Sequence, residues 1–364
     1  MKKVLNYNFD IKIINNGFVM CKNIKCAEIK YGKLIIIDEK RCPVLLKRTK
    51  SISAWLEDRA CDSDRVNIKV LKKKLKIEDK DDCLIAMYNN AMNLTDGFWF
   101  KHNKSSAEYE KLRRFENSYG LCALNNIYDD FKAESFTYEL TNTGAMEKCW
   151  NYQMGKWNLI KKGTNAEIIS ECVASRTGEI LGMNVVQYEN RKIIYYSNIK
   201  SQLIKVSSCK NFTSDNVYFE SMYAYIGEDE DYKTTIDKLR EIEECDNCML
   251  IHDYLSMLAL DYIVYNIDRH THNYGLLKNF SDGKVISMAP AFDFNLCLTA
   301  NNCFVKDKSP DFMLKFVIDA VKYSKLDFKI KEADLSKLDC DENIKKFIIN
   351  NYENLKENLT NTIN

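Results

Sequence analysis

The sequence has 364 residues, of which 46% are hydrophobic and 29% are charged, and its formal net charge is +1. This mixture excludes a disordered chain, provides enough apolar material for a sizeable core, and at this length favours two or three domains over one. A charge so close to neutral gives no signal for nucleic acid or for an anionic membrane surface.

Membrane and secretion signals are not found. No stretch approaches the ~18 to 20 uninterrupted apolar residues of a membrane helix, and no apolar run follows the first lysines as it would in a secretory signal. Fourteen cysteines in such a chain indicate reduced thiols, so we expect a cytoplasmic protein. Cys245 and Cys248 have the spacing of a zinc knuckle, but no second close pair follows. We interpret them as two thiols near the start of a helix.

The N-terminal third is expected to form a small α/β domain. Short strands, such as the alternating stretch at 33–37, should precede Ser51, after which the apolar residues recur at helical spacing. Residues 96–100 combine a turn with the start of an apolar strand. We therefore predict an accessory domain over residues 1–105 and a polar connector over 106–135.

Strands are expected again from Phe136 to Leu140. A hairpin should follow, with arms at Cys149–Tyr152 and Trp157–Lys161 around a glycine-containing turn. Next we expect a helix from about Ala166 to Leu181, ended by a glycine. More strands should run to about residue 206, and mainly helices beyond it.

Strands with one helix, followed by helices, are the layout of a two-lobed kinase. We therefore predict an α+β, bilobal protein-kinase-like fold, with a β-rich N-lobe over residues 136–215 and a helical C-lobe over 216–364. Many other α+β proteins share this layout, so the functional argument depends on individual residues.

The strongest chemical signal is Asp268, with Asn273 five residues later and Asp293 before a phenylalanine further on. Phosphoryl transfer needs a carboxylate that orients the acceptor hydroxyl and takes its proton, and oxygen ligands for the Mg²⁺ ions that bridge the ATP phosphates. Protein kinases place these groups in this order and spacing. We predict Asp268 as the catalytic base, Asn273 and Asp293 as metal ligands, and ATP and Mg²⁺ as cofactors. A capped helix end followed by a solvated turn is the alternative.

Three blocks make the sequence similar to the HipA-like kinases, the family of bacterial toxin serine/threonine kinases and their relatives. The Asn-x-Asp-x-His-x-x-Asn pattern at 266–273 resembles the family's catalytic loop, and Ala-Pro-x-Phe-Asp at 289–293 its metal-binding loop. Residues 143–148 are similar to its short phosphate loop. The resemblance covers about residues 136–325 and implies a kinase that acts on a Ser or Thr hydroxyl of a protein. It also implies a positioning role for His270, where many eukaryotic kinases have a lysine.

The nucleotide-binding residues are predicted around two lysines. Lys161 alternates with an apolar neighbour on its strand, so its side chain should reach into the cleft, and Glu171 on the next helix is its natural partner. A surface lysine at a strand end is the alternative. Backbone N–H groups of Gly144 and Ala145, with Lys148 close by, should contact phosphate oxygens. The alternative there is a simple hairpin turn.

Regulation and partners are implied only by the resemblance. The family's phosphate loop carries a serine that becomes autophosphorylated and inactivates the enzyme. Thr141 stands at the matching offset and Thr143 is a second hydroxyl, so we expect autophosphorylation at one of them. We also expect an antitoxin or other regulatory partner that binds through the N-terminal domain, where the elements around Trp55 and Trp99 resemble variants from Gram-positive bacteria and their phages.

Two other functions stay open at this stage. The chain could be a nucleotide-binding regulatory or scaffold module that turns over little ATP, although the intact Asp268, Asn273 and Asp293 argue against a dead enzyme. It could also be a small-molecule or lipid kinase, because the fold does not determine the acceptor.

Overall fold

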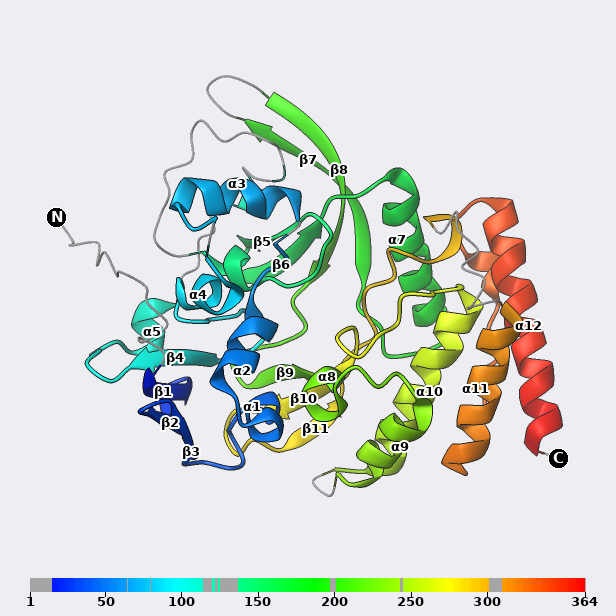
Figure 1. Ribbon diagram of the computed structural model, residues 1–364. Coiled ribbons are helices and arrows are strands. Elements are labelled where there is room, and N and C mark those ends of the chain that lie inside the picture. Colours follow the sequence, from blue (N-terminus) through cyan, green and yellow to red (C-terminus); the bar gives the residue numbers. More distant parts are fainter. Residues whose placement is uncertain are drawn as a thin grey trace.

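The computed structural model describes residues 15–63, 65–78, 80–113, 120–121, 124, 137–196, 201–242, 245–300 and 310–363. Over these ranges the chain has the α+β, bilobal architecture expected from the sequence, with the long helices gathered on the C-terminal side (Figure 1). Three antiparallel sheets form in the described part of the chain, one in each of three regions.

The N-terminal region combines a four-stranded sheet with short helices. The sheet has the order β3-β2-β1-β4. Its elements are β1 (Asn16–Cys21), β2 (Ile24–Lys30), β3 (Lys33–Ile36), α1 (Val44–Thr49), α2 (Ile52–Arg59), α3 (Val66–Leu75), α4 (Asp82–Met87), β4 (Phe98–His102) and α5 (Tyr109–Leu112). The first helix, α1, begins at Val44, before the predicted change from strand to helix at Ser51. The Ser51 side chain caps the second helix, α2, by accepting a hydrogen bond from the Ala54 N–H.

This region shares its apolar cores with both lobes. Phe98 packs in one cluster with Tyr218 of the C-lobe, at a ring-centroid distance of 5.2 Å. Trp99 belongs to a second cluster with Trp157 of the N-lobe. A third cluster joins α3 and α4 to Leu140. The N-terminal region therefore packs on both lobes through shared apolar clusters.

The N-lobe is built on a four-stranded sheet of order β5-β6-β8-β7, covered by one helix. Its elements are β5 (Lys148–Gln153), β6 (Lys156–Lys161), α7 (Asn165–Ile180), β7 (Tyr188–Tyr196) and β8 (Ser201–Lys210). The predicted hairpin is confirmed, with Met154 and Gly155 at positive φ in its turn. The predicted helix is also confirmed, and Gly182 follows it in the left-handed region.

One predicted strand is wrong. Phe136 lies outside the described residues, and Tyr138–Thr141 form a 3-10 helix instead of a strand. All four residues are buried, so they do not alternate between a core face and a solvent face as a surface strand would. The Glu139 carboxylate accepts a hydrogen bond from the Trp150 N–H at 2.8 Å, and this buried contact fixes the turn.

The C-lobe contains a small sheet that the sequence did not predict. Its strands have the order β11-β10-β9. The elements of the lobe are β9 (Val217–Ser221), α8 (Met222–Ile226), α9 (Tyr232–Arg240), α10 (Asn247–Ile263), β10 (Gly275–Asn279), β11 (Val285–Met288), η3 (Leu298–Ala300), α11 (Pro310–Ser324), η4 (Leu335–Lys337) and α12 (Glu342–Ile363). These strands are short, and β9 pairs with β10 over more than fifty residues of sequence. Gly275 permits this pairing, because a Cβ there would lie 2.2 Å from the Glu220 carbonyl oxygen.

Candidate active site

The centre of the candidate site is a buried ammonium group at the end of β6. Lys161 Nζ lies 2.5 Å from Glu171 Oε1 on α7 and 2.7 Å from Asp293 Oδ1, which belongs to the loop after β11. Burial alone would lower the pKa of Lys161, but the negative charges of Asp293 and Glu171 overcome this effect and raise the pKa. The structure thus brings these three predicted residues into direct contact.

Two sets of hydrogen bonds orient Glu171 toward Lys161: one caps the start of helix α7, and the other binds the Glu171 carboxylate. Thr164 and Glu167 form a capping box at the N-terminus of the helix. Ser207 on β8 donates a hydrogen bond of 2.5 Å to Glu171 Oε2, the oxygen that does not face Lys161. The orientation of Glu171 is therefore determined by three elements of the N-lobe.

Asp293 has a strained backbone and a strongly ionised side chain. Its φ is +65°, an uncommon conformation for a residue with a side chain. Burial alone would raise the pKa of Asp293, but Lys161 and Lys148 overcome this effect and hold the pKa well below its usual range. The Asp293 N–H donates to the Tyr188 hydroxyl at 3.4 Å. The carboxylate is thus kept charged at the junction of the two lobes.

The loop that follows α10 is fixed by a buried carboxylate. Asp261, near the end of α10, accepts hydrogen bonds from Asn266 Nδ2 at 2.7 Å and from Arg269 Nε at 2.8 Å. Asn266 in turn accepts from the Asp268 N–H at 3.4 Å. Asp268 therefore follows directly on a rigid segment, and its own side chain is half-buried.

Arg269 joins this loop to the one that carries Asp293. Its Nη1 atom donates to the carbonyl oxygens of Asn273 and Phe292, both at 2.7 Å. The Asn273 side chain donates through Nδ2 to the Asp268 carbonyl at 3.2 Å and faces His270 Nε2 at 2.9 Å. Asn273 Oδ1 makes no hydrogen bond within the described structure and can serve as a ligand.

The predicted phosphate loop lies above Lys148. Gly144 and Ala145 are exposed, whereas Lys148 is buried at the start of β5, where it pairs with Lys161 across the hairpin. A Cβ on Gly144 would lie 2.6 Å from Lys148 Nζ, so the loop approaches the ammonium closely at this glycine, whose φ is +95°. Burial lowers the pKa of Lys148 to about 8.

Side chains of the N-terminal region donate hydrogen bonds to backbone carbonyls in and beside this loop. Arg65, which directly precedes α3 and is almost completely buried, donates through Nη1 to the Asn142 carbonyl at 2.8 Å and through Nη2 to the Glu139 carbonyl at 3.2 Å. Asn67 donates to the Lys148 carbonyl at 3.2 Å. The conformation of the loop therefore depends on residues about eighty positions earlier in the chain.

The two threonines of this segment have different environments. Thr141 is fully buried; its hydroxyl donates to the Met92 carbonyl and accepts from Asn89 Nδ2 at 3.3 Å. Thr143 is exposed beside Gly144. In this conformation only Thr143 presents its hydroxyl to solvent.

Two oxygen groups of the site could contribute to a Mg²⁺ site. Among the described residues, no group of three or more His, Cys, Asp or Glu side chains could hold a metal ion. Mg²⁺ commonly takes one or two protein oxygens and completes its shell with phosphates and water. Asp293, ionised and partly exposed, and Asn273, with its free Oδ1, would supply those two oxygens.

Apolar side chains adjoin Lys161 at the lobe junction. Val186, Tyr188 and Cys209 are buried there, and Leu159, Phe212 and Phe292 pack against them. The site thus combines an apolar surface, two lysines and the two loops that carry Asp268 and Asp293.

Comparison with known proteins gives the fold. No protein-family model and no curated protein matches the sequence. Among solved structures, HipA of Shewanella oneidensis, in a complex with HipB and operator DNA, matches with a TM-score of 0.51 and 11% identity, over 95% of this chain and 97% of that one. The chain has the HipA-like kinase fold. The proinflammatory kinase CtkA of Helicobacter pylori is also similar, with a TM-score of 0.43 and 18% identity, over 59% of this chain and 94% of that one.

In this HipA-like kinase fold, sequence reasoning missed the residues that hold the predicted ones. They are Asp261, Arg269, Ser207 and Arg65. Asp261 had a usable signal, because a single carboxylate in the apolar stretch 254–263 must find a buried partner. Ser207 and Arg65 had none, since their partners are distant in sequence.

Two further expectations can be placed on the structure. Cys245 and Cys248 lie at the N-terminus of α10, as the interpretation as two thiols near a helix start requires. Among the described helices, none combines the length and the apolar character needed to cross a membrane. The cytoplasmic location stays a prediction.

The depressed pKa of Lys148 predicts how stability depends on pH. Below pH ~8 both the folded and the unfolded protein carry this proton; above it the folded protein releases the proton while the unfolded chain keeps it up to ~10.4. The free energy of unfolding should therefore rise between pH 8 and 10 relative to Lys148→Met, by up to roughly 3 kcal/mol. Denaturant titrations of both proteins measure the difference. Parallel curves over this range would contradict the shift.

Proposed function

We propose that this protein is a kinase that transfers a phosphoryl group from Mg²⁺-ATP to a Ser or Thr hydroxyl of another protein. The observation that carries the proposal is the contact of Lys161 with Glu171 and Asp293, next to a loop in which Arg269 links Asn273 to Phe292. In kinases a Lys–Glu pair aligns the α- and β-phosphates, and the second acidic loop holds the metal.

Each predicted residue receives a specific role in this proposal. ATP supplies the phosphoryl group when it is bound. Lys161 and Lys148, with the N–H groups of Gly144 and Ala145, would bind phosphate oxygens, and Asn273 and Asp293 would hold Mg²⁺. Asp268 would orient the acceptor hydroxyl and take its proton.

The acceptor would bind beside the catalytic loop. A cavity of about 370 Å³ adjoins the catalytic loop. Tyr254, Leu258, Phe312 and Phe316 line it together with His270, and Phe312 is half exposed. Apolar side chains beside the acceptor position suit a protein or lipid acceptor better than a small polar metabolite.

Substitution of Asp268 should separate binding from chemistry. Asp268→Asn keeps the shape of the side chain but not its basicity, so we expect loss of phosphoryl transfer by ~10² to 10⁴ with folding and ATP binding retained. The assay is labelled phosphate transfer to protein in a host lysate. Asp282→Asn, a half-buried residue of the β10–β11 turn, is the matched control and should transfer normally. Near-normal turnover in Asp268→Asn would contradict the assignment of Asp268 as the catalytic base.

Substitution of the predicted metal ligands should weaken ATP binding, which Asp268→Asn is expected to retain. Asn273→Ala and Asp293→Ala are expected to weaken nucleotide binding in Mg²⁺, more strongly for Asp293 because it contributes a charge. Calorimetry with ATP in Mg²⁺ and then in EDTA distinguishes them from Asp268→Asn. If both variants bind Mg²⁺-ATP like the wild type, these residues are not metal ligands.

Autophosphorylation, if it follows the resemblance, should occur at Thr143, because Thr141 is buried and hydrogen-bonded. A phosphate there adds about −1.5 to −2 charges beside the expected ATP phosphates and should lower activity. Mass spectrometry after incubation with Mg²⁺-ATP gives the site, with Asp268→Asn and Thr143→Val as controls. Phosphate on Thr141, or equal phosphate in Asp268→Asn, would contradict the prediction.

The N-terminal sheet is our proposed surface for an antitoxin-like or other regulatory partner. Ile24, Tyr31, Ile35 and Ile37, on and beside β2 and β3, are large apolar residues with 44% to 81% of their surface exposed. Exposed apolar side chains gathered in one region commonly mark an interaction site.

A double substitution on this sheet tests the partner surface. Ile24→Ser/Ile35→Ser should remove a partner protein that co-purifies from the native host, because the contact loses apolar area. Ile194→Ser/Leu203→Ser, at the similarly exposed β7–β8 pair, is the matched control. Equal recovery of the partner with both variants would place its site elsewhere.

A further inference from the structure

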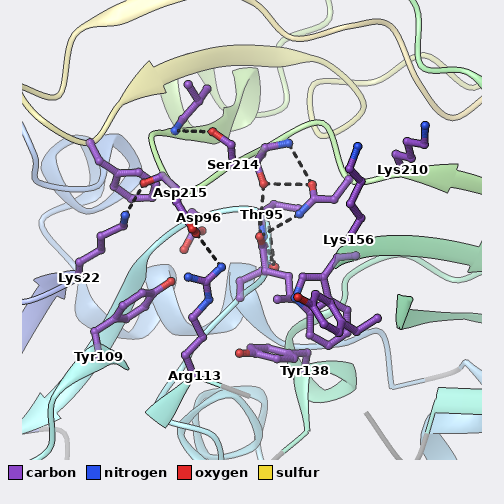
Figure 2. A pocket seen from close by; sticks show the side chains of 18 of the residues that line it. Lys22, Thr95, Asp96, Tyr109, Arg113, Tyr138, Lys156, Lys210, Ser214 and Asp215 are labelled. Atoms are coloured by element: carbon purple, nitrogen blue, oxygen red, sulfur yellow. Dashed lines mark hydrogen bonds and ion pairs between the residues drawn. The ribbon is translucent and has the colours of Figure 1, made fainter. Parts of the chain in front are cut away.

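A second cavity has a volume of about 400 Å³. Figure 2 shows residues that line it. The N-terminal region, the β5–β6 hairpin and residues 210–217 meet there, and none of Asp268, Asn273 and Asp293 lines it. Its volume is within the roughly 300 to 1,000 Å³ of sites for small organic ligands. No step of the proposed kinase reaction uses it.

One wall of this cavity is aromatic. Tyr109, Tyr138 and Trp157 are buried in it, and the rings of Tyr138 and Trp157 meet edge to face at a centroid distance of 5.5 Å. The indole N–H of Trp157 is buried and makes no hydrogen bond within the described structure. The aromatic side chains make this wall suited to packing against the planar ring of a ligand.

The charges in the cavity favour an anion. Asp96 is neutralised by Arg59, which binds both its oxygens at 2.8 and 3.0 Å. Asp215 is paired with Arg113 at 2.7 Å. With the acidic groups compensated, the lysines determine the net charge of the lining.

Three lysines contribute that positive charge, from two sides. Lys156 and Lys210 lie on the side opposite Lys22 (Figure 2). Both are exposed, and within the described residues their ammonium groups have no hydrogen bond or ion pair. Lys22 donates to the Asp215 carbonyl and lies 4.2 Å from the centre of the Phe280 ring, but it has no carboxylate partner there.

We propose that this cavity binds a small organic phosphate with a planar ring, of the size of a nucleoside monophosphate. Lys156 and Lys210 would bind the phosphate, and the wall of Tyr138 and Trp157 would pack against the ring. The proposal goes beyond the kinase activity and does not depend on it.

The position of the cavity gives such a ligand a regulatory role. Residues 211–216 connect the N-lobe strand β8 to the C-lobe strand β9. Asn211 and Thr213 in this connection already donate to the Leu94 carbonyl, at 3.2 and 3.4 Å. A ligand held between the connection, the hairpin and the N-terminal region would fix the two lobes relative to each other.

Photolabelling and calorimetry on the full chain test the proposal. 8-Azido-AMP should label peptides that contain residues 109–113 or 152–157. By calorimetry, AMP should bind more tightly than adenosine, which lacks the phosphate, and than ribose 5-phosphate, which lacks the ring. Lys156→Ala/Lys210→Ala should weaken AMP at least about tenfold, since two charge-assisted contacts are lost.

The matched control is Lys329→Ala/Lys337→Ala, which removes the same charge from two exposed lysines in the C-lobe. It should bind AMP and be labelled like the wild type. Equal AMP affinity in the two double variants would overturn the proposal. So would label confined to peptides around Lys161 and Asp293, because AMP would then occupy only the candidate ATP cleft.

Discussion

The arrangement of the lobes depends on the buried ammonium group of Lys161, which is stabilised by ion pairs with the carboxylates of Glu171 and Asp293. Lys161 lies between Glu171 and Asp293, so one charge joins β6, α7 and the loop after β11. Removing one partner from a buried ion pair costs about 3 to 5 kcal/mol, because the remaining charge stays out of water. An arrangement that separated these residues and left Lys161 buried would carry this cost, so the ion pairs favour the observed arrangement of the lobes.

The same physical device recurs at two other places in the fold. Arg269 is paired with Asp261 and links the loop that carries Asp268 to the loop that carries Asp293. Arg65 holds the phosphate loop from the N-terminal region. In each case a buried guanidinium satisfies several carbonyl oxygens at once, which its planar fork of donors suits. The flexible parts of the candidate site are thus positioned by buried cations from rigid elements.

The N-terminal region is part of this arrangement rather than an appended module. Its aromatic residues Phe98 and Trp99 enter clusters with the C-lobe and the N-lobe respectively. Because the lobe connection is hydrogen-bonded to the Leu94 carbonyl, a partner or ligand that bound the N-terminal region would act on the connection directly. This geometry offers a physical route from a regulatory contact to the candidate site.

Local patterns in the sequence determined much of the fold and the composition of the site. The β5–β6 hairpin, α7 and α10 were predictable because turn residues, caps and apolar periodicity act within a few residues. The order of Asp268, Asn273 and Asp293 was visible for the same reason, and their roles stay predictions.

Only the tertiary structure decided which side chains meet. Lys161 and Asp293 are 132 positions apart, and Arg65 and Gly144 are 79. It also turned the expected strand at Tyr138–Thr141 into a 3-10 helix and paired β9 with β10. Contacts over such separations arise from packing and from the need to pair buried charges, and neither leaves a local period in the sequence.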